Sequence, residues 1–298
     1  MEIKSQINLF VGIGCDLNQR LPAEVLKFSI LEKINNKLNI IFLNEHKEWE
    51  NILKKDLTQR TPFSLQRFLC AESVVNSDAD IGIYFDSDMI ALQPLTKLVE
   101  EFSKTNKNIA VVSAKDEWRR REQSSVLIFN KNGANELWNS YKMFLKKKIN
   151  YDELIYLKSI NNIGRINPDW NSLEYLDSST CLIHFTDMDT QPWLRNGNVN
   201  AGIWHTYLWK FIQNPENEKI LLDEVSKKNV RPSLLSIIEY GPSMPVLLLS
   251  SRIRDINFVP KHRFNSLLGN FLRKFFPFLL KFFLEISFIK SNGNPNIR

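Results

Sequence analysis

The chain has 298 residues, of which 43% are hydrophobic and 24% are charged, which is the composition of an ordinary globular protein and allows one large domain or one domain with an appendage. No run reaches the roughly 18 apolar residues of a membrane span, which excludes a membrane-spanning helix. The net charge of +6 favours anionic partners such as nucleotide phosphates, acidic lipids or nucleic acid, without choosing among them.

The cysteines and the N-terminus predict a compartment. Cys15, Cys70 and Cys181 show neither disulfide nor metal-binding spacing, so we expect buried reduced thiols in a reducing environment. The N-terminal residues lack the apolar core of a signal peptide. We therefore expect a cytoplasmic protein of bacterial or viral origin.

Short apolar runs alternate with helical patterns along the chain. This order predicts an α/β protein with parallel strands and right-handed crossovers. The expected strands cover residues 7–13, 38–43, 81–85, 109–113, 124–130 and 181–185. The expected helices cover residues 23–35, 62–75, 95–103 and 131–147.

Two carboxylates follow the strand at 81–85. Asp86 and Asp88 are two residues apart, so their side chains lie on one side if the extended geometry continues. Carboxylate oxygens at the end of a buried strand suit Mg²⁺ or Mn²⁺. The Asp-x-Asp pattern also occurs at 78–80 and 187–189, and chance alone supplies such matches. Only the triplet at 86–88 follows a buried strand.

The order of several motifs resembles the GT-A glycosyltransferases, in particular family 8, over roughly residues 5–205. The motifs are Phe63–Leu69, the Asp86–Asp88 strand, Leu182–Thr186 and then Gln191–Trp193. The resemblance implies an α/β fold of the GT-A type, a Rossmann-like mixed sheet flanked by helices, with a C-terminal helical extension. It also implies retaining chemistry on a nucleotide-sugar donor.

In that family a histidine shortly before Pro-Trp completes the metal site, and His184 matches it. The resemblance thus implies that Asp86, Asp88 and His184 hold Mn²⁺ or Mg²⁺. A lone histidine is more often structural, but neutral imidazole readily accepts Mn²⁺. The lysine that the family often carries before Pro-Trp is missing here, and Arg195 is its nearest cationic substitute.

The same resemblance implies donor-binding residues. Asp16 would hold the nucleotide, Arg67 would reach the donor, and Ser124 and Ser125 would let the backbone approach the sugar. Each residue has a structural alternative: a turn aspartate before a helix for Asp16, a solvated helix arginine for Arg67, and a strand edge without ligand contact for the serines.

The resemblance further implies residues around the reacting carbon. Asp152 matches the family's acidic residue, and Glu153 stands where the family has an amide, so these two are the catalytic candidates. An aspartate near a helix start is also a common N-cap. Asp169, Trp170 and Asn171 would line the acceptor side, or Trp170 is a structural aromatic.

We expect a catalytic domain over residues 1–260, with a helical extension at 196–260, followed by a basic amphipathic tail at 261–298. Within the tail, residues 263–289 repeat Phe and Leu at helical spacing between cationic residues. This pattern predicts an in-plane helix on an anionic membrane surface. The alternative is a helix that packs on the catalytic domain or on a second copy.

These motifs favour a metal-dependent glycosyltransferase that moves a sugar, most simply from a UDP-sugar, to a glycan or lipid-linked acceptor. It would work at the inner face of the membrane, and no nucleic acid partner is expected. Two alternatives remain: the same fold acting as a nucleotidyltransferase or sugar-nucleotide hydrolase, and a non-catalytic protein that binds membrane or nucleic acid.

Overall fold

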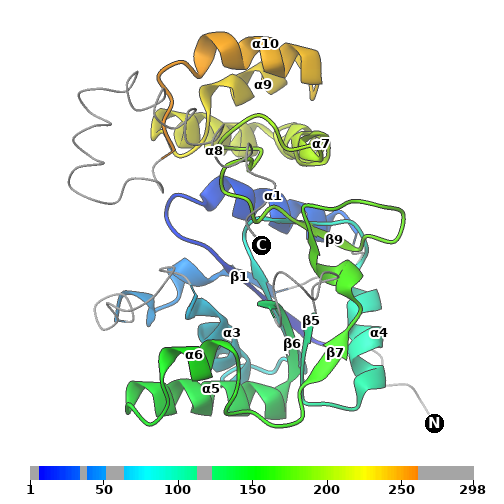
Figure 1. Ribbon diagram of the computed structural model, residues 1–298, viewed down its shortest axis with the longest axis vertical. Coiled ribbons are helices and arrows are strands. Elements are labelled where there is room, and N and C mark those ends of the chain that lie inside the picture. The colour runs from blue at the N-terminus through cyan, green and yellow to red at the C-terminus, as the bar shows by residue number, and fades with distance from the viewer. Residues whose placement is uncertain (1–6, 34–38, 52–63, 113–122, 261–298) are drawn as a thin grey trace, which may run out of the picture. The chain divides into compact units, whose positions relative to one another are not determined.

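The computed structural model describes residues 7–33, 39–51, 64–112 and 123–260 (Figure 1). The chain divides into two compact units, Met1–Thr186 and Asp187–Arg298, which we call the first and second unit. The predicted extension at 196–260 lies within the second unit. The predicted membrane helix at 263–289 lies outside the described residues.

A six-stranded mixed sheet forms the centre of the first unit, in the order β2-β1-β3-β6-β5-β7. Its strands are β1 (Leu9–Gly14), β2 (Asn39–Phe42), β3 (Ile81–Asp86), β5 (Ile109–Val112), β6 (Gln123–Asn130) and β7 (Gly164–Ile166). β1 is parallel to β2 and β3, and β7 is parallel to β5. β6 is antiparallel to both neighbours, so the sheet is mixed, as the resemblance to the GT-A fold implied. A strand buried on both faces has the same apolar pattern in either direction.

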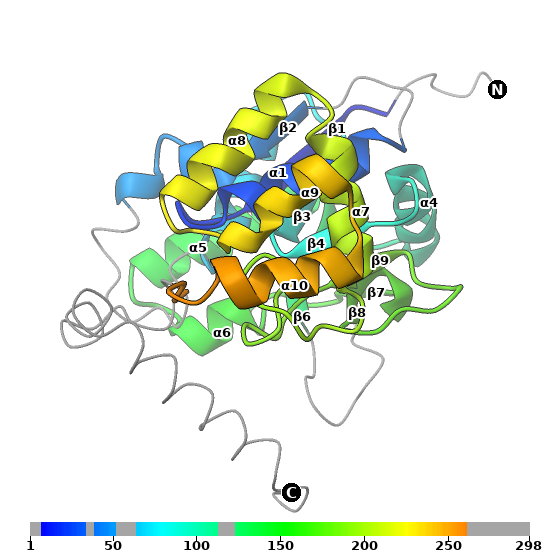
Figure 2. The same cartoon turned by 90° about the horizontal axis from the view of Figure 1, so that it is seen from above.

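Helices cover both faces of this sheet (Figures 1 and 2). Alternate residues of β3 show the division, since Tyr84 packs with α3 (Gln66–Val75) and α5 (Lys131–Leu145). Ile83 and Phe85 pack on the other side with α1 (Arg20–Leu31) and α4 (Leu95–Thr105). The sheet therefore separates two apolar layers, and the ends of its strands are the places left for polar chemistry.

A second, three-stranded sheet of order β4-β9-β8 lies in the same unit. Its strands are β4 (Met89–Ala91), β9 (Leu182–His184) and β8 (Ser172–Leu173). The strand predicted at 181–185 is thus real, but it belongs to this small sheet and not to the main one. β4 and β8 were not predicted, because two or three residues give no periodicity to read.

All three cysteines are free and buried, as predicted. Burial raises the pKa of the Cys15 thiol to about 12, although a hydrogen bond with Asn44 opposes the shift. Burial also raises the pKa of Cys70. Neutral, desolvated thiols are poor nucleophiles and metal ligands, so these cysteines are core residues.

The described part of the second unit is helical, with α7 (Ala201–Phe211), α8 (Pro215–Ser226), α9 (Ser236–Tyr240) and α10 (Met244–Arg254) joined by short loops and the 3₁₀ turn Pro232–Leu235. No helix among the described residues is both long and apolar enough to cross a bilayer.

Arg231 is the buried hub of this unit, with 1% of its surface exposed. Its Nε donates to the carbonyl of Pro192 at 2.9 Å, and Nη2 lies 3.0 Å from His205 Nε2. Nη1 donates to Ser233 Oγ at 3.0 Å and lies 3.8 Å from Asp255 Oδ2. A single guanidinium thus satisfies groups from four segments, which is how a charge can be buried without being left unpaired.

Candidate metal centre

The end of β3 places the first carboxylate. Asp86 is the last residue of β3, opposite Gly14 at the end of β1, and is 8% exposed. Tyr84, two residues earlier on the same face, donates its hydroxyl to Asp86 Oδ1 at 2.6 Å. A side chain at position 14 would clash, since an added Cβ would lie 2.2 Å from the Tyr84 hydroxyl. Gly14 therefore makes room for the phenol that orients Asp86.

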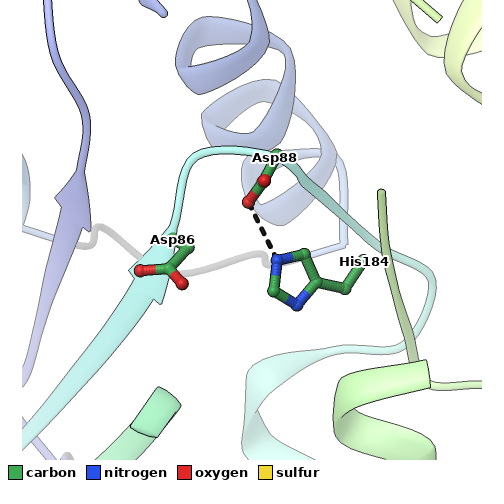
Figure 3. Close-up of side chains that lie close together, drawn as sticks. All are labelled: Asp86, Asp88 and His184. Carbon is green, nitrogen blue, oxygen red and sulfur yellow. Dashed lines mark ion pairs between the residues drawn. The ribbon is translucent and has the colours of Figure 1, made fainter. Parts of the chain in front are cut away.

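The small sheet brings the other two groups to this point. β4 and β9 pair antiparallel with Met89 opposite His184, and Phe185 N donates to the carbonyl of Asp88 at 2.8 Å. His184 Nε2 lies 3.0 Å from Asp88 Oδ1. Ligand atoms of Asp86, Asp88 and His184 all lie within 4.8 Å of one another (Figure 3). Residues about a hundred positions apart thus meet as the sequence predicted.

Asn171 fixes the histidine ring. It ends the 3₁₀ turn Pro168–Asn171, just before β8, which pairs parallel with β9. Its Oδ1 lies 2.8 Å from His184 Nδ1, and its side chain is fully buried. An amide oxygen can only accept, so Nδ1 carries a proton, and Nε2 is the nitrogen that faces the two carboxylates and is left for a metal ion. This is the arrangement that metal-ligating histidines adopt, with the second ring nitrogen held by a polar partner.

The electrostatics of the cluster show a shortage of positive charge. Burial raises the pKa of Asp86, Arg67 opposes this shift, and the Asp88 carboxylate adds to it. Burial alone would lower the pKa of His184, but Asp88 and then Asp86 raise it above its ordinary value. Two partly desolvated carboxylates thus draw a proton onto the imidazole, and a divalent cation would satisfy them better.

The donor set fits a divalent ion. Carboxylate oxygens and one imidazole nitrogen suit Mn²⁺, and with more water ligands Mg²⁺. Several buried polar atoms nearby have no hydrogen-bond partner among the described residues: Arg67 Nε, Ser87 Oγ and Asn171 Nδ2. Buried polar groups are normally paired, so these orphans are consistent with a polar ligand at this edge of the sheet.

Arg67 is not a solvated helix arginine. It is 7% exposed on α3, its Nη2 lies 4.0 Å from Asp86 Oδ1, and its Nη1 donates to Ser124 Oγ. Ser124 in turn donates to the carbonyl of Ile155 at 3.3 Å. Because β6 is antiparallel to β3, the start of β6 lies beside the end of β3, which brings Ser124 and Ser125 to the cluster. Their contact with a sugar remains a prediction.

Asp16 lies two residues beyond the end of β1, at the same edge of the sheet. Its Oδ1 accepts a hydrogen bond from Asn18 N at 2.7 Å, which is the turn role weighed above. Burial raises its pKa, and the backbone hydrogen bonds oppose the shift. The preceding residue is held by Gln66, which bonds both the N–H and the C=O of Cys15 at 2.8 Å. Nucleotide binding by Asp16 remains a prediction.

The catalytic candidates lie on α6 (Tyr151–Ile155). The N-cap of α6 is Asn150, so the N-cap alternative for Asp152 is wrong, and Asp152 is exposed. Glu153 completes a capping box, with its Oε2 accepting from Asn150 N at 2.8 Å. Its carboxylate is therefore already engaged in holding the helix start.

The three residues predicted for the acceptor side are all buried in this conformation. Trp170 has no exposed surface and donates its Nε1–H to Glu101 at 3.1 Å, which matches the structural alternative. Asn171 serves His184, as described above. Asp169 is 8% exposed, and its carbonyl accepts from Cys181 N at 2.8 Å. Arg195 belongs to the second unit, so its role at the cluster stays a prediction.

Sequence reasoning missed Tyr84 and the true position of Asn171. Tyr84 was detectable, since residues i and i+2 of a strand share a face. The contact between Asn171 and His184 depends on the strand β8, which has only two residues and therefore no periodicity that could predict it from the sequence.

Neither a protein-family model nor a curated protein sequence matches the chain. In structure it is similar to the glycosyltransferase GlyE of Streptococcus pneumoniae TIGR4, with a TM-score of 0.51 and 15% identity over 76% of this chain and 65% of GlyE. It is also similar to the bifunctional glycosyltransferase WbbM, with a TM-score of 0.51 and 13% identity over 73% of this chain and 52% of WbbM. The chain therefore spans less than two thirds of either protein. At these identities the similarity shows the fold, and it is the GT-A fold expected from the sequence.

Proposed function

We propose that the protein is a metal-dependent glycosyltransferase. It takes a sugar from a nucleotide-sugar, most simply a UDP-sugar, and transfers it to a glycan or lipid-linked acceptor. The observation that carries this proposal is the cluster of Asp86, Asp88 and His184 at the C-terminal end of β3 in a GT-A fold. Ligands of open α/β sheets bind at that end of the strands.

The three residues would hold Mn²⁺ or Mg²⁺, and the ion, when bound, supplies Lewis acidity that neutralises charge on a departing diphosphate. Arg67 adds a buried cation beside Asp86. Arg195 is the second candidate for a phosphate contact. Tyr84 and Asn171 keep Asp86 and His184 in position, so little reorganisation is needed on binding.

Retention at the anomeric carbon is proposed from the family resemblance. Proton NMR of the first product formed from an α-linked donor decides the point. A β-configured product would mean inversion, and Asp152 would then be tested as a general base.

The main experiment is a thermal-shift screen of nucleotide-sugars with and without Mn²⁺. The right donor should raise the melting temperature only when the metal is present, by mass action on the folded state. Product analysis then separates the alternatives: transfer yields a free nucleoside diphosphate and a glycosylated acceptor, whereas hydrolysis yields free sugar. Lack of any metal-dependent nucleotide binding would contradict the proposal.

We also propose that the protein works at the inner face of an anionic membrane, attached through residues 263–289. Six cationic residues against one acidic residue between 261 and 290 motivate this part. The full chain should float with anionic vesicles, and Arg273→Glu with Lys274→Glu should weaken the binding. Equal flotation of this variant and the unaltered chain would contradict it.

A further inference from the structure

The exposed side of α10 is apolar. Leu248 is 48% exposed, Leu249 61% and Ile253 66%, and Ile256, just after the helix, is 45% exposed. These are four of the fifteen large exposed hydrophobic side chains of the described residues, and they fall within nine positions. The others are spread along the chain. We call these four residues the α10 stripe.

Helical spacing puts the stripe on one side. At 100° per residue, Leu248, Leu249 and Ile253 fall within about 140° of one another, and Arg252 falls between them. Leu247, about 100° from Leu248 on the other side, is the residue of α10 that is buried. The helix thus buries one apolar residue in the core and exposes three apolar residues to solvent, whereas an ordinary surface helix buries its apolar face.

The helix is held in place from behind. Asp255 accepts from Ser233 N at 2.8 Å and from Ser233 Oγ at 2.7 Å, and Asn196 donates to Ser251. These contacts fix both the last turn of α10 and the residue after it. The stripe is therefore presented by a fixed helix, and its exposure does not come from a frayed end.

Charge decides what the stripe meets. α10 contains no acidic residue, and Arg252 and Arg254 in its last turn are exposed. The only acid nearby along the chain, Asp255, is turned toward Ser233 and Arg231. The tail at 261–290 is also cationic, and a second α10 would bring two arginine pairs together. The arginines of α10 would repel both the cationic tail and a second α10. The partner should therefore be apolar at its centre and anionic at its surface, as an acidic lipid bilayer is.

We propose that the α10 stripe is a membrane-contacting face, in which Leu248, Leu249, Ile253 and Ile256 enter the interface of an anionic bilayer and Arg252 and Arg254 meet the headgroups. The long arginine side chains can reach the headgroup level from such a face. This inference extends the proposed membrane attachment from the tail to the folded second unit, and it does not depend on the enzymatic activity.

The test is flotation of the full-length chain with vesicles of phosphatidylglycerol and phosphatidylcholine, and with vesicles of phosphatidylcholine alone. The variant Leu249→Ser with Ile253→Ser should reduce the partition coefficient on anionic vesicles by about tenfold, because it removes two inserting side chains. Leu222→Ser is the matched control, since Leu222 is 45% exposed on α8 and outside the stripe. It should float like the unaltered chain. All three proteins should keep the same melting temperature, because the altered side chains are exposed.

Equal flotation of the double variant and the control would overturn the stripe proposal and leave the attachment through the tail intact. Failure of the unaltered chain to float would overturn both. Two other occupants give different results. If the stripe packs against a second copy, the double variant becomes monomeric in sedimentation while its flotation is unchanged. If the tail covers the stripe, the double variant gains protease cleavage after residue 260 with undiminished flotation. Equal binding to phosphatidylcholine alone would overturn the choice of an anionic surface.

Discussion

Two buried histidines, one in each unit, have pKa values that move in opposite directions. His184 is 3% exposed and His205 is 1% exposed, so desolvation pushes the pKa of both downward. Beside His184 lie two carboxylates, which raise its pKa above the ordinary value. Beside His205 lies the guanidinium of Arg231, and with burial it lowers the pKa of His205 to about 3. Burial lowers the pKa of both histidines, and only the carboxylates beside His184 reverse the sign of the shift.

This difference separates a binding group from a structural one. His205 is neutral at physiological pH and accepts a hydrogen bond from an arginine that other groups already satisfy. His184 turns its Nε2 toward two carboxylates that lack a full complement of positive charge and so favour a proton or a cation there. A buried histidine between acids is a site where a cation replaces a proton. A buried histidine against a cation is part of a core.

The largest expected effect comes from removing a carboxylate of the cluster around His184. Asp88→Asn removes a ligand charge with little change in volume, so Mn²⁺ affinity should fall by about a thousandfold or more and transfer should be abolished, with the fold intact. Isothermal calorimetry with Mn²⁺ measures the first effect. The matched control is Asp78→Asn, an exposed aspartate of the triplet at the other end of β3. Full activity of Asp86→Asn with Asp88→Asn in the presence of a chelator would rule out the metal assignment.

Removing Arg231, which lies beside His205, should lower the stability of the protein. Arg231→Ala leaves Asp255 and several buried acceptors without their donor, so we expect a loss of about 3–5 kcal/mol in the free energy of unfolding. Lys227→Ala is the contrast, because its pair with Asp223 is 51% and 39% exposed and contributes under about 0.5 kcal/mol. Urea unfolding measures both. A similar loss for the two variants would show that the Arg231 network is not the structural hub of its unit.

Asn171 should matter to the metal more than to the fold. Asn171→Ala removes the acceptor of His184 Nδ1, so Mn²⁺ affinity should fall by about ten- to a hundredfold. Asn171→Asp keeps an acceptor at that position and should retain most of the affinity. Asn108→Ala, at an exposed asparagine, serves as the control. An unchanged Mn²⁺ affinity in Asn171→Ala would remove Asn171 from the site.

His205 should make the stability of the protein depend on pH. Its pKa is lowered in the folded state, so between the unfolded value of 6.5 and about 3 only the unfolded chain takes up the proton. The contribution of neutral His205 to the free energy of unfolding is therefore fully present above pH 6.5 and is lost as the pH falls through this window. From pH 7 to pH 5 the unaltered chain should lose about 2 kcal/mol relative to His205→Gln. Parallel curves of stability against pH for the two proteins would contradict a neutral His205.

The sequence predicted the strand that carries Asp86 because a buried apolar run that ends in carboxylates needs no tertiary information to be recognised. It also predicted that His184 would join them, through the order of the motifs. It did not predict how they meet. The small sheet that sets His184 beside Asp88 consists of strands of two or three residues, whose pairing is decided by contacts distant in the chain.

The same limit explains Trp170 and the α10 stripe. From the sequence alone, an aromatic residue in a polar loop can be either a ligand contact or a core residue. Only the packing shows that Trp170 is a core residue. The helical extension predicted at 196–260 contains α10, and an ordinary surface helix turns its apolar face inward. Which face is buried depends on the helices behind it, and the structure turns the wider apolar side outward.

The measurement that tests the central claim most directly is pulsed electron paramagnetic resonance of the protein loaded with one equivalent of Mn²⁺. The chain has four histidines, His46, His184, His205 and His262. If Asp86, Asp88 and His184 hold the ion, the spectrum contains nitrogen modulation from one directly bound imidazole. His184→Asn should abolish this modulation, and His46→Asn should leave it unchanged. Modulation that survives in His184→Asn, or that is absent from the unaltered protein, would contradict the account.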